Sequence, residues 1–278
     1  MKNLILFLLI SFSVNADGQV SCSLIYDGDG DGSVGTGDLL GLLAEFGQTC
    51  DDDSLFSCGL SVAYQGYDYG TVLIGEQCWF AENLRSVNYD NGDAIPSNLS
   101  DSEWETTNSG AVAVYGEDAG CDNYSPDIEA CDPALSLQQY GRLYNWYAVD
   151  DSRGLCPTGW HVPTDGEWMT MEMALGMSEA EANGTGYRGA DQGTQMKTDY
   201  GWYNGGNGAN SSGFSGLPGG GRYYYFGYFG DAGSFGNWWS SSPNGSSEWY
   251  RGLSSGNGSV SRFSGDRRSG FSVRCVQD

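Results

Sequence analysis

The sequence predicts a loop-rich α+β domain that occupies residues 59–278. Three observations predict it: a clear helix start, short apolar stretches between turn residues, and many aromatic side chains in a glycine- and serine-rich carboxyl half. Such a composition without aromatic residues would favour disorder. Trp, Tyr and Phe each bury a large apolar area, which offsets the entropy lost when the backbone is ordered. We therefore expect the carboxyl half to fold.

The first elements of this domain are a hairpin and a long insertion. Residues 71–74 and 77–84 are apolar stretches on either side of Gly75-Glu76, and this pattern predicts two paired strands. Residues 86–138 are polar and rich in turn residues. This composition predicts a long irregular segment.

A helix is predicted to begin after Thr164 and to run to about residue 177. Thr164 can cap the first turn, and Glu167 stands three residues later, so the two can form a capping box. Trp168, Met171 and Leu175 recur at helical spacing and predict a buried face. Beyond residue 184, short aromatic strands are predicted at 238–240, 249–253, 260–263 and 271–276.

The amino terminus and the composition indicate an exported protein. Residues 1–16 have the charged start, short apolar run and small-residue end of a secretory signal peptide. That run is too short to span a bilayer, and no later segment is apolar enough to do so. The net charge of −24 argues against nucleic acid and anionic membranes as partners. We expect a secreted chain, outside the cell or at its surface, without membrane insertion.

Residues 27–38 match the pattern of a twelve-residue calcium loop. The loop has glycine at position 6, where the turn is sharp, and valine at position 8. Leucines and a phenylalanine at helical spacing follow it in residues 39–46, whereas a plain acidic linker would lack such a helix. The predicted calcium ligands, at positions 1, 3, 5, 7 (through the carbonyl) and 12, are Asp27, Asp29, Asp31, Ser33 and Asp38.

Residues 17–50 are expected to form a small calcium module, followed by a solvated linker at 51–58. Cys22 and Cys50 bracket the calcium loop and can close it covalently. A unit of this size buries little apolar surface, so an ion and a disulfide would supply the stability it lacks. The eight cysteines contain no C-x-x-C spacing, which in an exported chain favours disulfides over structural zinc.

Two strings that look catalytic are not expected to be active sites. Residues 252–256 spell G-x-S-x-G, but a nucleophile elbow lies between a strand and a helix, and here a turn into a strand follows. The sole histidine, His161, lies in a predicted strand, where packing or a structural hydrogen bond is its usual role. Residues 184–189 spell G-x-G-x-x-G, but they follow a helix and predict a loop. We assign no catalytic residue.

A tyrosine-rich stretch is the candidate ligand-binding surface. Tyr with Ser, Gly and Asn is the composition of adaptable recognition loops, and exposed aromatic faces can stack on sugar rings. Trp238, Trp239 and Trp249 are expected to belong to the core instead. Residues 223–229 are harder to bury as a whole, because consecutive residues of a strand face opposite ways. The candidate ligand contacts are Tyr223, Tyr224, Tyr225 and Tyr228.

Several blocks of the chain, in order, resemble the Fibrobacter succinogenes major paralogous domain. The resemblance covers about residues 62–278, and its blocks lie at 81–84, 140–148, 153–168, 214–220, 238–242 and 271–276. It implies a fold similar to C-type-lectin-like domains and the formylglycine-generating-enzyme group, with small antiparallel sheets, one or two helices and long loops. The calcium-bridged sugar motif of calcium-dependent lectins is absent, so glycans would bind without a bridging ion. The family has no assigned biochemical role.

The same resemblance suggests disulfide pairings, which remain a hypothesis because eight cysteines permit many connectivities. Cys156 and Cys275 lie in matching blocks and are expected to pair. Cys58 is then the natural partner of Cys78, which leaves Cys121 with Cys131.

The amino-terminal unit resembles one half of a type I dockerin, whose two repeats bind cohesins; here one copy is present. We therefore expect a secreted, non-enzymatic calcium-binding protein whose lectin-like domain recognises an extracellular polysaccharide or glycoprotein. One alternative is a docking component of an extracellular polysaccharide-degrading assembly, with a scaffold protein as partner. A second is an uncharacterised carbohydrate-active enzyme.

Overall fold

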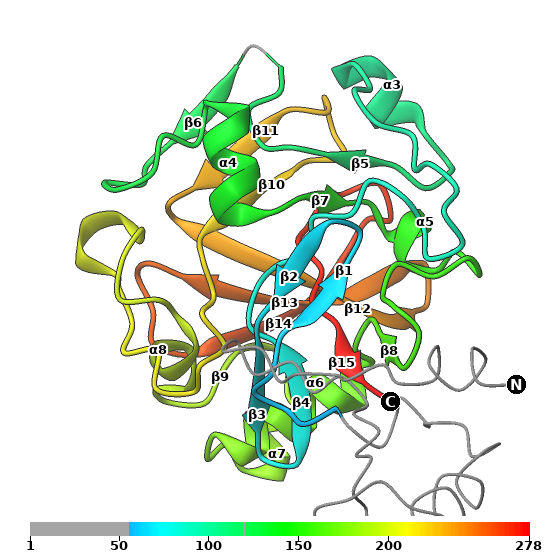
Figure 1. Cartoon of the computed structure of the whole chain (residues 1–278). Coiled ribbons are helices and arrows are strands. Elements are labelled where there is room, and N and C mark those ends of the chain that lie inside the picture. The colour runs from blue at the N-terminus through cyan, green and yellow to red at the C-terminus, as the bar shows by residue number, and fades with distance from the viewer. Residues whose placement is uncertain (1–55, 119) are drawn as a thin grey trace, which may run out of the picture. The chain divides into compact units, whose positions relative to one another are not determined.

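The computed structural model describes residues 56–118 and 120–278, and within them the chain forms sheets joined by long loops and short helices (Figure 1). The predicted α+β, loop-rich class is confirmed. The part of the chain from Cys58 to Asp278 is one compact unit. The predicted signal peptide, the calcium loop with its ligands, and the Cys22–Cys50 pair lie outside the described residues.

The largest sheet has seven strands in the order β6-β11-β10-β12-β13-β14-β9. These strands are β6 (Cys121–Asn123), β9 (Gly186–Arg188), β10 (Gly219–Arg222), β11 (Phe229–Ala232), β12 (Phe235–Asn244), β13 (Ser247–Ser254) and β14 (Val260–Gly265). Neighbours are antiparallel except for two pairs, β10 with β12 and β11 with β6, which are parallel. The small sheets were expected to be antiparallel, and these two pairs depart from that expectation.

A second sheet joins both ends of the domain. Its order is β3-β4-β15-β8, formed by β3 (Thr71–Ile74), β4 (Gln77–Phe80), β8 (Trp160–His161) and β15 (Val276–Gln277). The β3–β4 hairpin is the one predicted from the sequence, and Gly75 in its turn has φ +63°, a conformation that favours glycine. Two further pairs are β1 (Val62–Tyr64) with β2 (Tyr67–Tyr69) and β5 (Val112–Ala113) with β7 (Leu143–Tyr144).

The helices are short and lie around these sheets (Figure 1). They are α3 (Asp101–Thr106), α4 (Pro133–Tyr140), α5 (Trp146–Val149), α6 (Asp165–Ala174), α7 (Glu179–Ala182), α8 (Gln192–Met196) and the 3-10 turn η2 (Tyr203–Gly205). The predicted capping box is confirmed: Thr164 accepts from the Glu167 amide, and Glu167 Oε2 accepts from the Thr164 amide at 2.7 Å. None of the helices among the described residues is long and apolar enough to cross a membrane.

Three local predictions need correction. Residues 86–138 are not wholly irregular, since they contain α3, β5, β6 and α4. The G-x-G-x-x-G string is not simply a loop, because its residues 186–188 form the edge strand β9, which pairs with β14. The predicted strand at 271–276 is reduced to β15 and isolated bridges, because the backbone of Phe271 and Ser272 pairs with several different segments.

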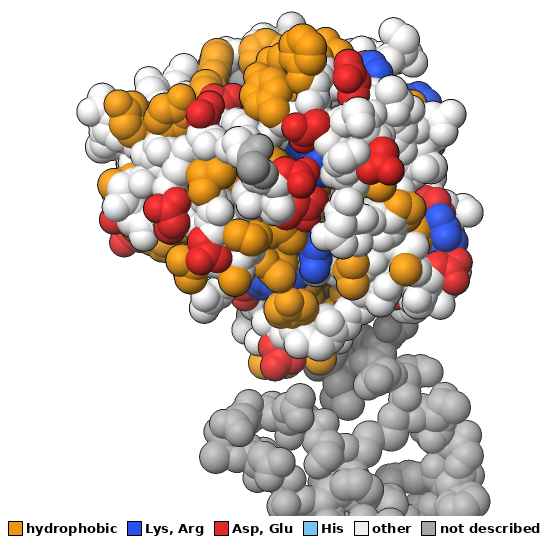
Figure 2. Space-filling model, turned by 90° about the horizontal axis from the view of Figure 1, so that it is seen from above, with side chains coloured by type: hydrophobic (Ala, Val, Ile, Leu, Met, Phe, Trp, Pro, Cys, Tyr) orange, Lys and Arg blue, Asp and Glu red, His pale blue; other side chains and the backbone are white. Residues whose placement is uncertain are grey.

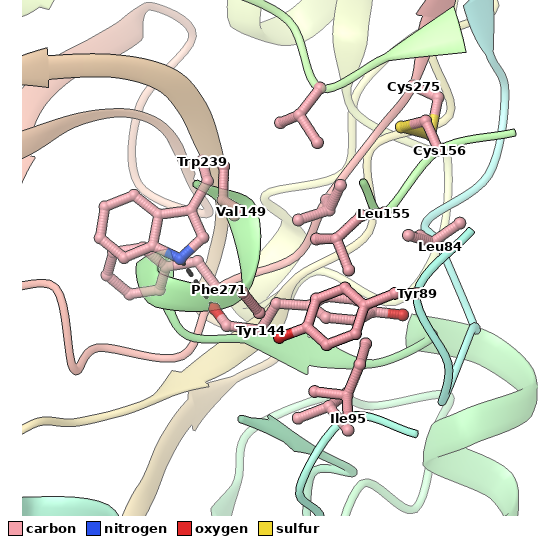
Figure 3. Close-up of a cluster of buried hydrophobic side chains, with 14 of the residues drawn as sticks. Leu84, Tyr89, Ile95, Tyr144, Val149, Leu155, Cys156, Trp239, Phe271 and Cys275 are labelled. Atoms are coloured by element: carbon pink, nitrogen blue, oxygen red, sulfur yellow. Dashed lines mark hydrogen bonds between the residues drawn. A yellow bond between two sulfur atoms is a disulfide. The ribbon is translucent and has the colours of Figure 1, made fainter. Parts of the chain in front are cut away.

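Two adjacent tryptophans of β12 lie on opposite faces of the large sheet. Consecutive strand residues point to opposite faces, so Trp238 and Trp239 of β12 enter different clusters. Figure 3 shows Trp239 beside Phe271, with its indole N–H donating to the Tyr144 carbonyl at 2.8 Å. Both tryptophans are fully buried, as predicted, whereas Trp249 is half-buried beneath the Arg262 guanidinium.

A buried ionic network connects α6 to the large sheet. The Glu172 carboxylate accepts from both terminal nitrogens of Arg188 at 2.8 and 2.9 Å, and from Arg251 Nε at 2.7 Å. Arg251 also donates to Asp165, whose two oxygens accept from Arg262 as well. These arginines hold the pKa of Asp165 below its usual value even though burial alone would raise it. The network fixes α6 and β9 on β13 and β14.

Three disulfides connect segments of the described chain. They are Cys58–Cys78, Cys121–Cys131 and Cys156–Cys275, which are the pairs that the resemblance implied. Cys156–Cys275 closes the longest loop of the three and lies in the buried cluster around Tyr144 and Trp239 (Figure 3). It joins the segment before β8 to the last residues of the chain.

Candidate functional site

The tyrosine-rich stretch forms the connection between β10 and β11, residues 223–228. Its three central side chains are the exposed ones: Tyr224, Tyr225 and Phe226 are 37%, 42% and 72% exposed. Phe226 has φ +64°, in the left-handed region that a bulky residue rarely adopts, and this places an apolar ring at the loop tip. We call residues 223–228 the aromatic loop.

The four predicted ligand contacts divide into two pairs. Tyr224 and Tyr225 are exposed, as a contact surface requires, whereas Tyr223 and Tyr228 are partly buried. Burial and the hydrogen bond to Asp231 raise the pKa of Tyr223, whose hydroxyl is committed to that carboxylate. The Tyr228 hydroxyl lies 2.9 Å from that of Tyr225, and this contact raises the pKa of Tyr228 to about 12. Phe226 was missed, because its sequence position alone did not show that its backbone turns outward.

Contacts within the loop hold its aromatic rings in place. The Tyr225 ring stacks on Tyr223 at 5.8 Å between centroids, and it meets Tyr224 and Tyr228 edge-on. The Arg268 guanidinium lies 5.3 Å from the Tyr224 ring centroid. Rings that are already ordered lose little conformational entropy when they contact a ligand.

Arg222 anchors the base of the aromatic loop. Its buried guanidinium lies between the rings of Trp104 and Phe229, 4.6 and 4.7 Å from their centroids. Its Nε donates to the Gly227 carbonyl at 2.8 Å, and its terminal nitrogens contact three carboxylates of the preceding insertion, those of Asp101, Glu117 and Asp118. Burial raises the pKa of Glu117. Through these contacts with Arg222, the insertion holds the base of the loop in place.

The loop lies at the upper end of the domain in Figure 1, and Figure 2 looks down on that end. Hydrophobic side chains gather there in patches, with acidic side chains beside them (Figure 2). A gathering of exposed aromatic side chains on one loop is a common sign of a binding surface.

A second candidate site is a cavity of about 850 Å³ under α4. Its walls come from the β1–β2 hairpin, the segment after β4, α4, and two loops that follow α8 (Figure 1). Its volume falls in the range of small-molecule sites. The lining side chains that matter for chemistry are Tyr67, Asp68, Glu82, Arg85, Tyr200 and Arg274. Sequence reasoning did not find this site.

Arg274 and Asn83 form the rigid floor of this cavity. Arg274 is 1% exposed, and its guanidinium donates to Asn83 Oδ1 at 2.7 Å and to the carbonyls of Phe80, Phe214 and Ser215. Within the described chain, no carboxylate lies within ion-pair distance of it. Burial lowers its pKa to about 9, so it remains charged at neutral pH. Asn83 also accepts from the indole N–H of Trp238 at 2.8 Å, and this bond connects the 81–84 segment to β12.

The strings that looked catalytic have structural roles. Ser254 ends β13 and a turn into β14 follows it, so the G-x-S-x-G string lacks the helix that a nucleophile elbow requires. Both ring nitrogens of His161 are occupied: Nδ1 lies 2.6 Å from Asp278 Oδ1, and Nε2 lies 2.8 Å from Glu167 Oε1. Burial opposes the imidazolium, but these two carboxylates outweigh it and raise the pKa of His161.

The described residues contain no group of histidine, cysteine, aspartate or glutamate side chains placed to hold a metal. The predicted ligands Asp27, Asp29, Asp31, Ser33 and Asp38 lie outside those residues. The described structure therefore neither supports nor opposes the predicted calcium loop.

Comparison with known proteins identifies the family of the larger domain. Residues 72–277 match the model of the Fibrobacter succinogenes major domain, and this match covers most of the chain. The chain belongs to this family. The family segment contains the aromatic loop and most of the cavity, but the cavity residues Tyr67 and Asp68 precede it. No curated protein and no solved structure matches this member of the family.

Proposed function

We propose that the Fibrobacter succinogenes major domain of this chain is a non-enzymatic recognition domain that binds an extracellular polysaccharide or glycoprotein glycan. The observation that supports this is the aromatic loop, where consecutive aromatic side chains are exposed on a backbone that Arg222 fixes. A pyranose ring presents an apolar C–H face, so an ordered aromatic ring offers it a complementary surface. Tyrosine also adds a hydroxyl for hydrogen bonding, at low entropic cost.

The finer elements of this proposal are a C-type-lectin-like fold and a secreted location. Two principal sheets with long loops support the first, and the three disulfides support an oxidising compartment. We place ligand contact on Tyr224, Tyr225 and Phe226, with Tyr223 and Tyr228 holding the rings in position.

Replacing Tyr225 with alanine is expected to weaken glycan binding at least tenfold, or about 1.4 kcal/mol, because the central ring of the loop is lost. The measurement is a glycan array followed by titration calorimetry on the strongest hit. Tyr187→Ala is the matched control, since Tyr187 is also exposed but lies on β9 at the other edge of the large sheet. Equal affinity of the two variants, or no glycan bound by the unaltered chain, would contradict the proposal.

We also propose that residues 27–38 bind one Ca²⁺, which stabilises a dockerin-like unit in residues 17–50. The spacing of Asp27, Asp29, Asp31 and Asp38 supports this, because alternate residues of a tight loop supply the six to eight oxygens that calcium needs. Docking to a scaffold protein is the alternative role of this unit, and its single calcium loop argues against it.

The calcium proposal is tested by terbium luminescence on the full chain. We expect sensitised emission that calcium displaces, and we expect Asp31→Ala with Asp38→Ala to abolish it, because two carboxylate ligands are removed. Asp51→Ala with Asp52→Ala is the control, since it removes the same charge just outside the loop. Emission that survives the loop substitutions would show that the ion binds elsewhere.

A further inference from the structure

We infer that the cavity under α4 is a second binding site, which takes a neutral sugar unit of an oligosaccharide. This inference rests on the proposed function of glycan recognition. The residues that carry it are separate from those of the aromatic loop. The class of ligand follows from three properties of the cavity: its charge, its hydrogen-bonding groups and its exposed tyrosines.

The charged side chains of the cavity balance one another. Two cations, Arg85 and Arg274, face two carboxylates, Asp68 and Glu82, and one opposite pair is joined directly, with Arg85 Nη1 2.6 Å from Glu82 Oε2. A site built for an anion or a cation would have an excess of the opposite charge. The net charge of −24 on the chain would further oppose an anionic ligand. A neutral ligand fits this balance.

The cavity has fixed hydrogen-bonding groups that remain available to a ligand. Among the described residues, Glu82 Oε1 has only one long contact, to the Gly70 amide at 3.4 Å, and it can accept further hydrogen bonds. Arg274 has five N–H donors, of which four have acceptors in the described chain, so one N–H of Nη2 is left. A hydroxyl can donate to the carboxylate and accept from the guanidinium, and adjacent sugar hydroxyls can do both together.

Two tyrosine rings give the cavity apolar walls. Tyr67 and Tyr200 are 37% and 41% exposed, and both line the cavity from different segments of the chain. The Tyr67 ring is held by the Arg85 guanidinium, 5.5 Å from its centroid. Apolar walls with a few fixed polar groups are the usual composition of a small-molecule site.

The cavity can accept one unit of a longer chain. A second hollow of about 500 Å³ shares the lining residues Ala134 and Leu137 of α4 and extends toward Arg142. The two hollows therefore meet at the same turn of α4. An oligosaccharide bound in the first has a surface along which its next unit can lie.

The test is titration calorimetry of the full chain with neutral tetrasaccharides of glucose, xylose, mannose or galactose, and with tetragalacturonate as the charged counterpart. We expect at least one neutral probe to bind with a Kd in the millimolar range or tighter. Tyr200→Ala removes one wall, and Ala134→Trp fills the space from an exposed helical position. Each is expected to weaken binding of that probe at least tenfold.

The matched control is Leu135→Trp, which adds an indole at the neighbouring exposed position that does not line either hollow. It is expected to keep the Kd within twofold, and so is Tyr187→Ala, which removes an exposed tyrosine of β9 that lines neither hollow. The inference is overturned if no neutral probe binds, if Ala134→Trp binds as tightly as the unaltered chain, or if tetragalacturonate binds best. Loss of binding in Tyr225→Ala alone would also overturn it, while leaving the aromatic loop as the glycan site.

Discussion

Replacing Cys156 and Cys275 together with alanine is expected to lower the free energy of unfolding by about 5 kcal/mol, the largest effect of any disulfide in the described chain. The reason is the length of loop that the disulfide closes, because the cysteines are 119 residues apart. Cross-linking removes more conformational entropy from the unfolded chain as the closed loop grows. The measurement is urea unfolding followed by tryptophan fluorescence.

The other two disulfides are the internal controls. Cys58–Cys78 and Cys121–Cys131 have separations of 20 and 10 residues, so the same relation gives about 3 kcal/mol for each. The expected order of destabilisation is therefore set by loop length. A smaller loss for the Cys156–Cys275 pair than for either control would contradict this explanation.

Replacing Glu172 with leucine is expected to lower the free energy of unfolding by about 3–5 kcal/mol, because it leaves buried arginines without their carboxylate. Glu172 is fully buried, and Arg188 loses its only ion-pair partner among the described residues. Arg251 keeps Asp165, at 2.7 Å from its Nη1. The measurement is again the urea midpoint and slope.

A double substitution separates two contributions to the loss of stability: the buried Arg188 charge left without a partner, and the lost packing of the Glu172 side chain. Glu172→Leu with Arg188→Met removes both members of the pair, so it is expected to be less destabilising than Glu172→Leu alone. Asp93→Asn is the surface control. Asp93 forms an exposed ion pair with Arg153, so the midpoint of urea unfolding is expected to stay unchanged. A double variant that is less stable than the single one would show that the network acts chiefly through packing.

Features whose residues lie close together in the sequence could be predicted. The capping box of α6 needs only Thr164 and Glu167, three residues apart, and the structure confirms it. The β3–β4 hairpin needs only its turn and two short apolar stretches. The burial of Trp238 and Trp239 also followed from residue type, because large aromatic side chains carry most of the apolar area of such a chain.

Features that depend on distant segments could not be predicted. The strand expected at 271–276 is interrupted, because its backbone groups bond to segments around Tyr144 and Asn237, which no local pattern reveals. The exposure of Phe226 depends on the positive φ of one residue in a six-residue connection. Arg222 is a surface residue by type, yet it is buried because an insertion more than a hundred residues earlier supplies its carboxylates.

By itself, then, the sequence determined the family, the α+β class, the helix start and the spacing of the proposed calcium loop. The helix start and the calcium loop each depend on residues within a short window, and the family shows in several short blocks that occur in order. Only the tertiary structure decided which tyrosines are exposed and that a cavity exists. Tyr67, Glu82, Ala134, Tyr200 and Arg274 come from separate segments that meet only when the sheets and α4 pack together. Their juxtaposition depends on long-range packing and buried polar contacts, which leave no periodic signal in the chain.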